Sequence, residues 1–222
     1  MIGPRLGPPQ ATMLAFLTTD LRVSPRDLRR ILQSAADETF NRVTVDDHAS
    51  TNDTAAILAS GVGGLTIDAA GERDFEAALE EVCASLAYQI AADGEGATKV
   101  VKVRVEAAPS EHAARTIART IANSPLVKCA MHGNDPNWGR IVSAAGMAGV
   151  AFDPQRCRLT LQGVAVFARG GPRPFDAADL SRRLAATEVE VHLHCGLGDG
   201  ASTVWTCDLS KDYVAINADY HT

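Results

Sequence analysis

The apolar positions of the chain recur with two different periods, which predict strands alternating with helices. Short apolar runs and strict apolar–polar alternation indicate strands, whereas spacing by three and four residues indicates amphipathic helices. The predicted strands cover residues 14–19, 43–45, 54–60, 98–107, 126–130, 158–163, 164–168, 187–195, 202–209 and 213–222. The predicted helices cover residues 25–40, 74–93, 110–123, 141–147 and 176–186. This order of elements predicts a mixed α/β fold.

Composition excludes several classes of protein. The 222 residues, of which 46% are hydrophobic and 22% charged, are ordinary for a globular protein of one large or two small domains. The net charge of −6 and the absence of any dense Lys/Arg stretch argue against a nucleic-acid partner and favour small solutes. No apolar run approaches the roughly 18 residues of a membrane span, and no signal peptide is visible. We therefore expect a cytoplasmic protein that has no membrane contact.

The cysteines and histidines do not predict a metal site. The five cysteines are an odd number without any Cys-x-x-Cys spacing, so they indicate neither a disulfide framework nor bound zinc. His192 and His194 share one face of a predicted strand, but no third ligand at a typical spacing joins them. We interpret this pair as an exposed polar face. His132 lies among turn-forming residues, and we assign it no catalytic role.

A polar cluster at residues 46–53 contains several oxygen and nitrogen ligands, namely Asp46, Asp47, His48 and Asp53. Its spacing matches no standard metal loop, and turns rich in Asp and Asn usually satisfy their own backbone groups. We expect this cluster to shape the wall of a site without binding an ion.

Thr12 is a candidate nucleophile. Pro8 and Pro9 keep the preceding chain out of regular structure, and an apolar run begins directly after Thr12. Cleavage of the bond between Ala11 and Thr12 would give Thr12 a free α-amine beside its hydroxyl. That amine can act as the base for the hydroxyl, so one residue would supply both nucleophile and base. The alternative is an ordinary loop that enters a buried strand.

Glu95 is a candidate ligand-binding carboxylate because it lies between Gly94 and Gly96. Glycines allow a sharp turn and a close approach of the backbone to a ligand. The alternative is a solvated loop acid after a helix.

Six blocks along the whole chain, in the same order, resemble the glutamate N-acetyltransferases, also called ornithine acetyltransferases. The block around Ala11-Thr12-Met13-Leu14 is similar to the self-cleavage site of that family. The other blocks are Ser50-Thr51-Asn52-Asp53-Thr54, Gly94-Glu95-Gly96-Ala97-Thr98-Lys99, Asn123-Ser124-Pro125-Leu126-Val127-Lys128, Asp135-Pro136-Asn137-Trp138-Gly139-Arg140 and Tyr213-Val214-Ala215-Ile216-Asn217-Ala218-Asp219-Tyr220. The resemblance is to the C-terminal, or β, subunit of the family.

The resemblance implies a fold and a set of site residues. The fold is the β-chain part of an αββα sandwich of the N-terminal-nucleophile type, followed by a C-terminal α/β lobe. We expect residues 1–98 to form the nucleophile-bearing part and residues 99–222 to form the second lobe, whose tail returns to the active site. Self-cleavage between Ala11 and Thr12 would release the catalytic Thr12. Substrate would contact Thr12, Glu95, Asn217 and Thr222, with no metal and no organic cofactor.

The resemblance also implies an activity and a partner. An acetyl group would pass from N2-acetyl-L-ornithine to L-glutamate through an acetyl-threonine, and acetyl-CoA is a further possible donor. The family pairs this β-chain with an α-chain, in a heterotetramer of two α and two β chains. We expect the chain alone to be nearly inactive, because the oxyanion hole belongs to the α-chain. Two alternatives stay open: a non-catalytic remnant, and a related self-processing amidase or aminopeptidase in which water replaces glutamate.

Overall fold

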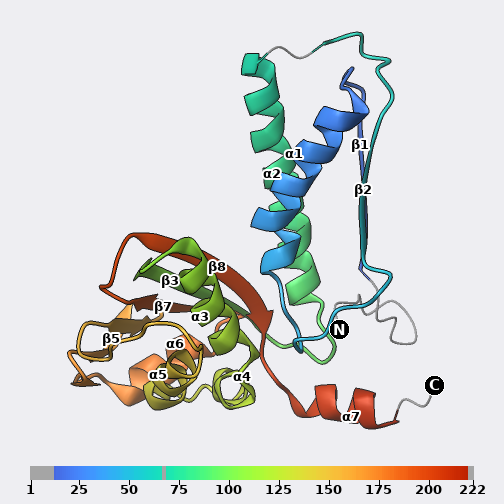
Figure 1. The fold of residues 1–222 in the computed structure, drawn as a ribbon. Helices are drawn as coiled ribbons and strands as arrows, with labels where there is room; N and C mark the ends of the chain where they lie inside the picture. The colour runs from blue at the N-terminus through green and yellow to red at the C-terminus, as the bar shows by residue number, and fades with distance from the viewer. Residues whose placement is uncertain (1–12, 67–68, 220–222) are drawn as a thin grey trace.

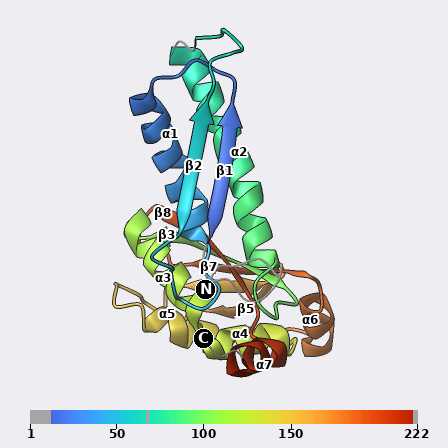
Figure 2. The same cartoon turned by 90° about the vertical axis from the view of Figure 1, so that its right-hand side faces the viewer.

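The computed structural model describes residues 13–66 and 69–219, which form two lobes (Figure 1). The first lobe contains strands β1 (Leu14–Thr19) and β2 (Thr54–Ala59) and helices α1 (Pro25–Glu38) and α2 (Ala69–Ala92). A short 3-10 helix, η1 (Phe40–Arg42), follows α1. The two strands are parallel, so the chain has to cross over between them, and it does so through α1. Both helices cover the same face of the strand pair (Figure 2).

Alternation along β1 divides its side chains between two faces. Ala15 and Leu17 face the helices and are each 6% exposed. On the opposite face, Leu14, Phe16 and Leu58 are 60%, 67% and 60% exposed. The register pairs Leu14 with Thr54 and Thr18 with Leu58, so these residues share one continuous outer face. The first lobe therefore consists of one layer of strands and one layer of helices, and the apolar outer face of the strands is exposed.

The start of α1 shows how local sequence sets the helix. The Ser24 hydroxyl accepts a hydrogen bond from the Asp27 backbone N–H at 3.2 Å, and Pro25 occupies the first turn. Both features are typical of helix N-termini. The buried face carries Leu28, Ile31 and Ala35 at the predicted helical spacing.

The second lobe is built on a six-stranded sheet with the order β6-β5-β4-β7-β3-β8. Its strands are β3 (Val100–Ala108), β4 (Arg158–Leu161), β5 (Val164–Ala168), β6 (Gly171–Pro172), β7 (Glu188–His194) and β8 (Gly200–Cys207). Its helices are α3 (Glu111–Asn123), α4 (Pro125–His132), α5 (Trp138–Gly146) and α6 (Ala177–Leu184). A last helix, α7 (Lys211–Asp219), lies beyond the sheet and below the end of α2 in Figure 1.

The core of the second lobe lies on one face of this sheet. Val101, Val103, Val105, Val191 and Leu193 are at most 1% exposed and pack with apolar residues of the helices. Alternate positions of the same strands, including Lys102, Arg104 and His192, lie on the opposite polar face. The predicted alternation of the strands is confirmed.

Three predicted strands are wrong. Residues 126–130 belong to helix α4, whose N-cap is Ser124, with Pro125 in the first turn. The C-terminal segment forms helix α7 as far as Asp219, and residues 220–222 lie outside the described residues. Residues 43–45 form no strand, since Val43 makes only an isolated bridge to Trp205. In addition, α2 begins at Ala69 and not at Asp74.

The predicted mixed α/β class is confirmed. The two lobes have separate main hydrophobic cores, one around Ile31 and Leu79 and the other around Val103 and Ile117. The division of the chain between residues 98 and 99 stays a prediction. Among the described residues, every helix is too short or too polar to cross a lipid bilayer.

Candidate active site

Glu95 lies in a tight turn where α2 ends and β3 begins. The Ala97 N–H donates to the Gly94 carbonyl at 2.9 Å, which closes the turn around Glu95 and Gly96. Gly96 has a φ of +64°, a conformation that glycine adopts at little cost. A Cβ at this position would lie 2.4 Å from the Tyr213 nitrogen, so glycine also permits close packing. Of the two glycines that flank Glu95, Gly96 is therefore the one whose conformation and close packing require glycine.

Helix α7 packs against this turn through its first residues. The Ser210 hydroxyl donates to the Gly96 carbonyl at 2.6 Å and accepts from the Tyr213 N–H at 3.1 Å. Ser210 thus caps α7 and fastens it to the turn. None of the α7 side chains is buried, so polar contacts and not apolar packing hold this helix.

The turn and α7 bring Glu95 and Asn217 together. The Asn217 amide Nδ2 donates to Glu95 Oε2 at 2.8 Å and to the Tyr213 carbonyl at 3.0 Å. Glu95 is only 8% exposed. The carboxylate and the side-chain amide therefore form one polar pair, although 122 residues separate them in the chain.

The loop between η1 and β2 connects this pair to the start of β1. The Tyr213 hydroxyl donates to Asp46 Oδ2 at 3.1 Å, while the Met13 N–H donates to Asp53 Oδ1 at 2.8 Å. Burial, together with the nearby Glu95 carboxylate, raises the pKa of the Tyr213 phenol. One loop thus contacts both α7 and the residue that follows Thr12. Both strands of the first lobe begin at the end next to the second lobe (Figure 2).

Asp208 fastens the segment behind Glu95. Its Oδ1 accepts from the backbone N–H groups of Thr98 and Lys99 at 2.7 and 2.9 Å. Its Oδ2 accepts from the Thr98 hydroxyl at 2.6 Å and from His132 Nδ1 at 2.7 Å. Burial of Asp208 opposes ionisation, but these hydrogen bonds outweigh it and hold the pKa of the carboxyl below its ordinary value. Asp208 is therefore a charged anchor between β8 and the loop that carries Glu95.

Two buried lysines lie close to this anchor. Lys99 donates through Nζ to the carbonyls of Met131 and Leu184, each at 2.7 Å. Lys128 donates to the Val45 carbonyl and lies 3.7 Å from Cys207 Sγ. Burial lowers the pKa of both ammonium groups. Lys99 therefore joins α4 and α6 to the start of β3, whereas Lys128 joins α4 to the loop between η1 and β2.

The structure brings together two of the predicted site residues, Glu95 and Asn217. Ala11, Thr12 and Thr222 lie outside the described residues, so their positions stay predictions. Asp208 was not predicted from the sequence. In the sequence, Asp208 is only a single acidic residue near the end of the strand predicted at residues 202–209. Nothing in that position indicates that its hydrogen-bond partners lie about 110 residues away.

One of the two histidines predicted to lie on a polar strand face has a carboxylate partner. His192 Nε2 lies 2.8 Å from Glu106 Oε2, in an ordinary side-chain contact. No group of three possible metal ligands occurs in the part of the chain that the structure describes.

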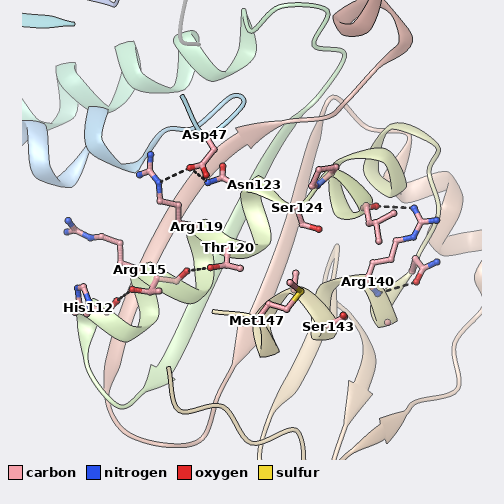
Figure 3. Close-up of a pocket in the computed structure, with 16 residues that line it drawn as sticks. Asp47, His112, Arg115, Arg119, Thr120, Asn123, Ser124, Arg140, Ser143 and Met147 are labelled. Atoms are coloured by element: carbon pink, nitrogen blue, oxygen red, sulfur yellow. Dashed lines mark hydrogen bonds and ion pairs between the residues drawn. The ribbon is translucent and has the colours of Figure 1, made fainter. Parts of the chain in front are cut away.

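A large cavity of about 1020 Å³ lies elsewhere, between α3 and the starts of α4 and α5 (Figure 3). Glu95 and Asn217, the predicted site residues that the structure describes, do not line it. Its arginines already have partners: Arg119 lies 3.9 Å from Asp47, and Arg140 donates to the Leu126 carbonyl at 3.0 Å. The candidate active site is therefore the Glu95–Asn217 pair and not this cavity.

Comparison with known proteins identifies the family of the chain. The family model described as "ArgJ family" matches residues 1–222. A "Glutamate N-acetyltransferase" from Methanopyrus kandleri is 45% identical over 97% of this chain and 57% of its own length. An "Arginine biosynthesis bifunctional protein ArgJ" from Deinococcus radiodurans is 48% identical over 97% of this chain and 54% of its own length. The chain thus spans about half the length of these curated relatives.

The fold has a close match among solved structures. The crystal structure of an arginine biosynthesis bifunctional protein ArgJ from Bacillus halodurans has a TM-score of 0.90 and 37% sequence identity. The match covers 94% of this chain and 100% of that chain. It confirms the predicted fold class, the N-terminal-nucleophile type with an added α/β lobe. With the family model matching the chain from end to end and the fold agreeing, the chain belongs to the ArgJ family.

Proposed function

We propose that the chain is the nucleophile-bearing β-chain of an enzyme that transfers acetyl from N2-acetyl-L-ornithine to L-glutamate. The observation that carries the proposal is the contact between Glu95 and Asn217 in a chain of the ArgJ family. A carboxylate and an amide held side by side suit the charged amine and polar groups of an amino acid. Thr222, three residues after α7, completes the proposed set of substrate contacts.

Thr12 is the proposed catalytic residue, released by cleavage of the Ala11–Thr12 bond. Its hydroxyl attacks the acetyl carbonyl of acetylornithine, and its own α-amine takes up the hydroxyl proton. The amide C–N bond breaks, and ornithine leaves with that proton on its amine. The glutamate amine then attacks the acetyl-Thr12 ester, which gives N-acetylglutamate and restores the hydroxyl. The anchoring of Met13 by Asp53 and of α7 by Asp46 supports placing Thr12 near Glu95.

The proposed α-chain partner has a surface to bind on this chain. The outer face of β1 and β2 exposes Leu14, Phe16 and Leu58, and water contact with such a face is unfavourable. A second strand layer from the α-chain would bury it and complete the αββα sandwich. An assembly of two α and two β chains, and acetyl-CoA as a further acetyl donor, belong to the same proposal.

Co-purification tests the pairing. Phe16→Asp places a charge on the outer face and is expected to abolish capture of this chain by a tagged α-chain. Val62→Asp is the matched control, because Val62 is 84% exposed but lies outside the strand pair. Equal capture of both variants would contradict the proposed surface.

The activity test follows two readouts of the chain expressed with its α-chain. An intact mass beginning at Thr12 is expected for the wild type and not for Thr12→Ala. Isotope-labelled acetylornithine is then expected to give labelled N-acetylglutamate. Glu95→Gln should raise the KM for the amino-acid substrates, whereas Glu80→Gln, which alters an exposed carboxylate of α2, should not.

Each alternative predicts a different result. Release of labelled acetate at a rate that glutamate does not change would indicate an amidase. Uncut chain and no turnover in the presence of the α-chain would indicate a non-catalytic remnant, and would overturn the proposal.

A further inference from the structure

Four arginines surround one cavity of about 530 Å³ at the far end of the second lobe. Arg156 precedes β4, Arg158 lies in β4, Arg169 follows β5 and Arg173 follows β6. His194 also lines the cavity, and no carboxylate side chain of the described residues does so. We call Arg156, Arg158, Arg169 and Arg173 the arginine cluster.

The backbone of the three strands holds the cluster together. The Arg169 N–H donates to the Cys157 carbonyl at 3.4 Å, and the Arg173 N–H donates to the Val166 carbonyl at 2.9 Å. The register places Arg158 between His194 on β7 and Ala168 on β5. Because Ala168 is small, the side of Arg158 that faces β5 is not filled by its register partner. The convergence of the four arginines therefore follows from the strand register.

The charges of the cluster are not neutralised within the described part of the chain. None of its four guanidinium groups makes an ion pair or a side-chain hydrogen bond with another described residue. The acid nearest in register, Glu106 opposite His194, is already engaged by Arg104 and His192. Other arginines of the same chain do pair with carboxylates: Arg30, Arg42, Arg104, Arg115, Arg119, Arg182 and Arg183.

All four arginines are exposed, so the cluster is a local patch of positive charge in a chain whose net charge is −6. Like charges around one cavity repel, and an anion that enters the cavity relieves that repulsion. The planar guanidinium group matches two oxygens of a phosphate at once, so four of these groups can hold two phosphates. We propose that the arginine cluster binds a small ligand that carries two or more phosphate groups.

The composition of the cavity favours a small ligand over single-stranded nucleic acid and over a lipid surface. Among the described residues, its wall has no Phe, Tyr or Trp side chain, so it lacks the large aromatic faces on which the bases of single-stranded nucleic acid stack. It also has none of the exposed large apolar side chains that would enter a lipid surface. The volume falls within the usual range for small-molecule sites, about 300–1,000 Å³.

This site is separate from the candidate active site. Arg158 pairs with His194, and His194 pairs with Glu106 near the end of β3. Val100, at the start of β3, follows the loop that carries Glu95, so about 20 Å of strand separates the two sites. In Figure 1, β5 and α7 lie on opposite sides of the lobe. The ligand would therefore be an effector or a structural anion and not an acetyl acceptor.

Calorimetric titration of the full chain with inorganic tripolyphosphate, pyrophosphate and sulfate tests the proposal. Affinity is expected to fall in that order and to weaken as salt is added, because exposed charges are screened over about 10 Å at 0.1 M. The double variant Arg158→Ala/Arg173→Ala is expected to lose at least tenfold in affinity for tripolyphosphate. Arg26→Ala/Arg29→Ala removes the same charge from the exposed side of α1 and should change affinity less than twofold.

Hydrogen exchange gives a readout that requires no variant. Tripolyphosphate is expected to slow exchange in residues 153–173 of the wild-type chain and not in α7. Titration with ATP distinguishes a free polyphosphate from a nucleotide as the ligand. An affinity equal to that for tripolyphosphate would show that the site recognises only the phosphates, and a higher affinity would show that it also recognises the nucleoside. No measurable binding of tripolyphosphate, equal loss in both double variants, or binding of an RNA oligonucleotide alone would each overturn the proposal.

Discussion

Replacing Gly96 by alanine tests how the candidate active site is held. The added Cβ would lie 2.4 Å from the Tyr213 nitrogen, whereas ordinary contacts begin at 3.4 Å. The start of α7 would therefore have to move by roughly 1 Å, the difference between these distances. Since α7 buries no side chain, we expect it to detach from the Glu95 turn while the rest of the fold stays intact.

The magnitude has two parts. A non-glycine residue at a φ of +64° costs about 1–2 kcal/mol of stability. Detachment of α7 breaks the contacts Ser210–Gly96, Tyr213–Asp46 and Asn217–Glu95. At about 1 kcal/mol for each hydrogen bond, this loss adds roughly 3 kcal/mol. Gly96→Ala should therefore lower the free energy of unfolding by about 4–5 kcal/mol.

Gly149→Ala is the matched control, because Gly149 has a φ of +70° and a Cβ added there would have no other atom within 4 Å. It should cost only the backbone part, about 1–2 kcal/mol. Urea denaturation measures both variants, and hydrogen exchange of residues 211–219 reports detachment of α7. Equal loss of stability in the two variants, with α7 equally protected, would refute the reasoning.

Three further predictions concern the groups around this site. Asp208→Asn should destabilise the fold by about 2–3 kcal/mol at neutral pH. The pKa of Asp208 is lower in the folded protein than in the unfolded chain, where it is about 3.9. Its contribution to stability is therefore complete above the unfolded pKa and is lost as pH falls through the folded pKa. The stability of Asp208→Asn should accordingly depend less on pH in this acid range than that of the wild type. Asn217→Asp sets two carboxylates side by side, and should speed exchange of α7 and raise the KM for acetylornithine about tenfold, which corresponds to ~1.4 kcal/mol. Lys128→Met leaves the Val45 carbonyl without its donor and should cost about 1–3 kcal/mol in urea denaturation.

Much of the fold could be predicted because the spacing of apolar residues agreed with the residues that typically begin and end helices and strands. The hairpin of β4 and β5 and helices α1, α3 and α6 begin and end close to the predicted residues. The strand predicted at residues 126–130 was wrong because a five-residue apolar run fits a buried strand and a helix equally well. The pair Ser124-Pro125 was the decisive signal. The Ser124 side chain accepts a hydrogen bond from the Val127 N–H, which has no partner within the helix, and proline is common in the first turn of a helix.

The site was less accessible to sequence reasoning. Glu95 and Asn217 were predicted from the family resemblance, because an acid between glycines and an amide near a chain end are common on their own. Their contact depends on α7, a helix without a buried face, and therefore without a periodic apolar signal. Asp208 bonds backbone groups of Thr98 and Lys99, and no residue pattern reports such contacts.

The position of β3 has a consequence for synthesis of the chain. β3 pairs with β7 on one side and with β8 on the other, so Val100 meets Glu188 and Cys207. A ribosome that adds about 5–20 residues per second needs roughly 5–20 s to make the hundred or so residues between them. During that interval the apolar positions of β3 have only α3 and the following helices to cover them. Folding of the second lobe on the ribosome therefore depends on helices that form before the sheet does.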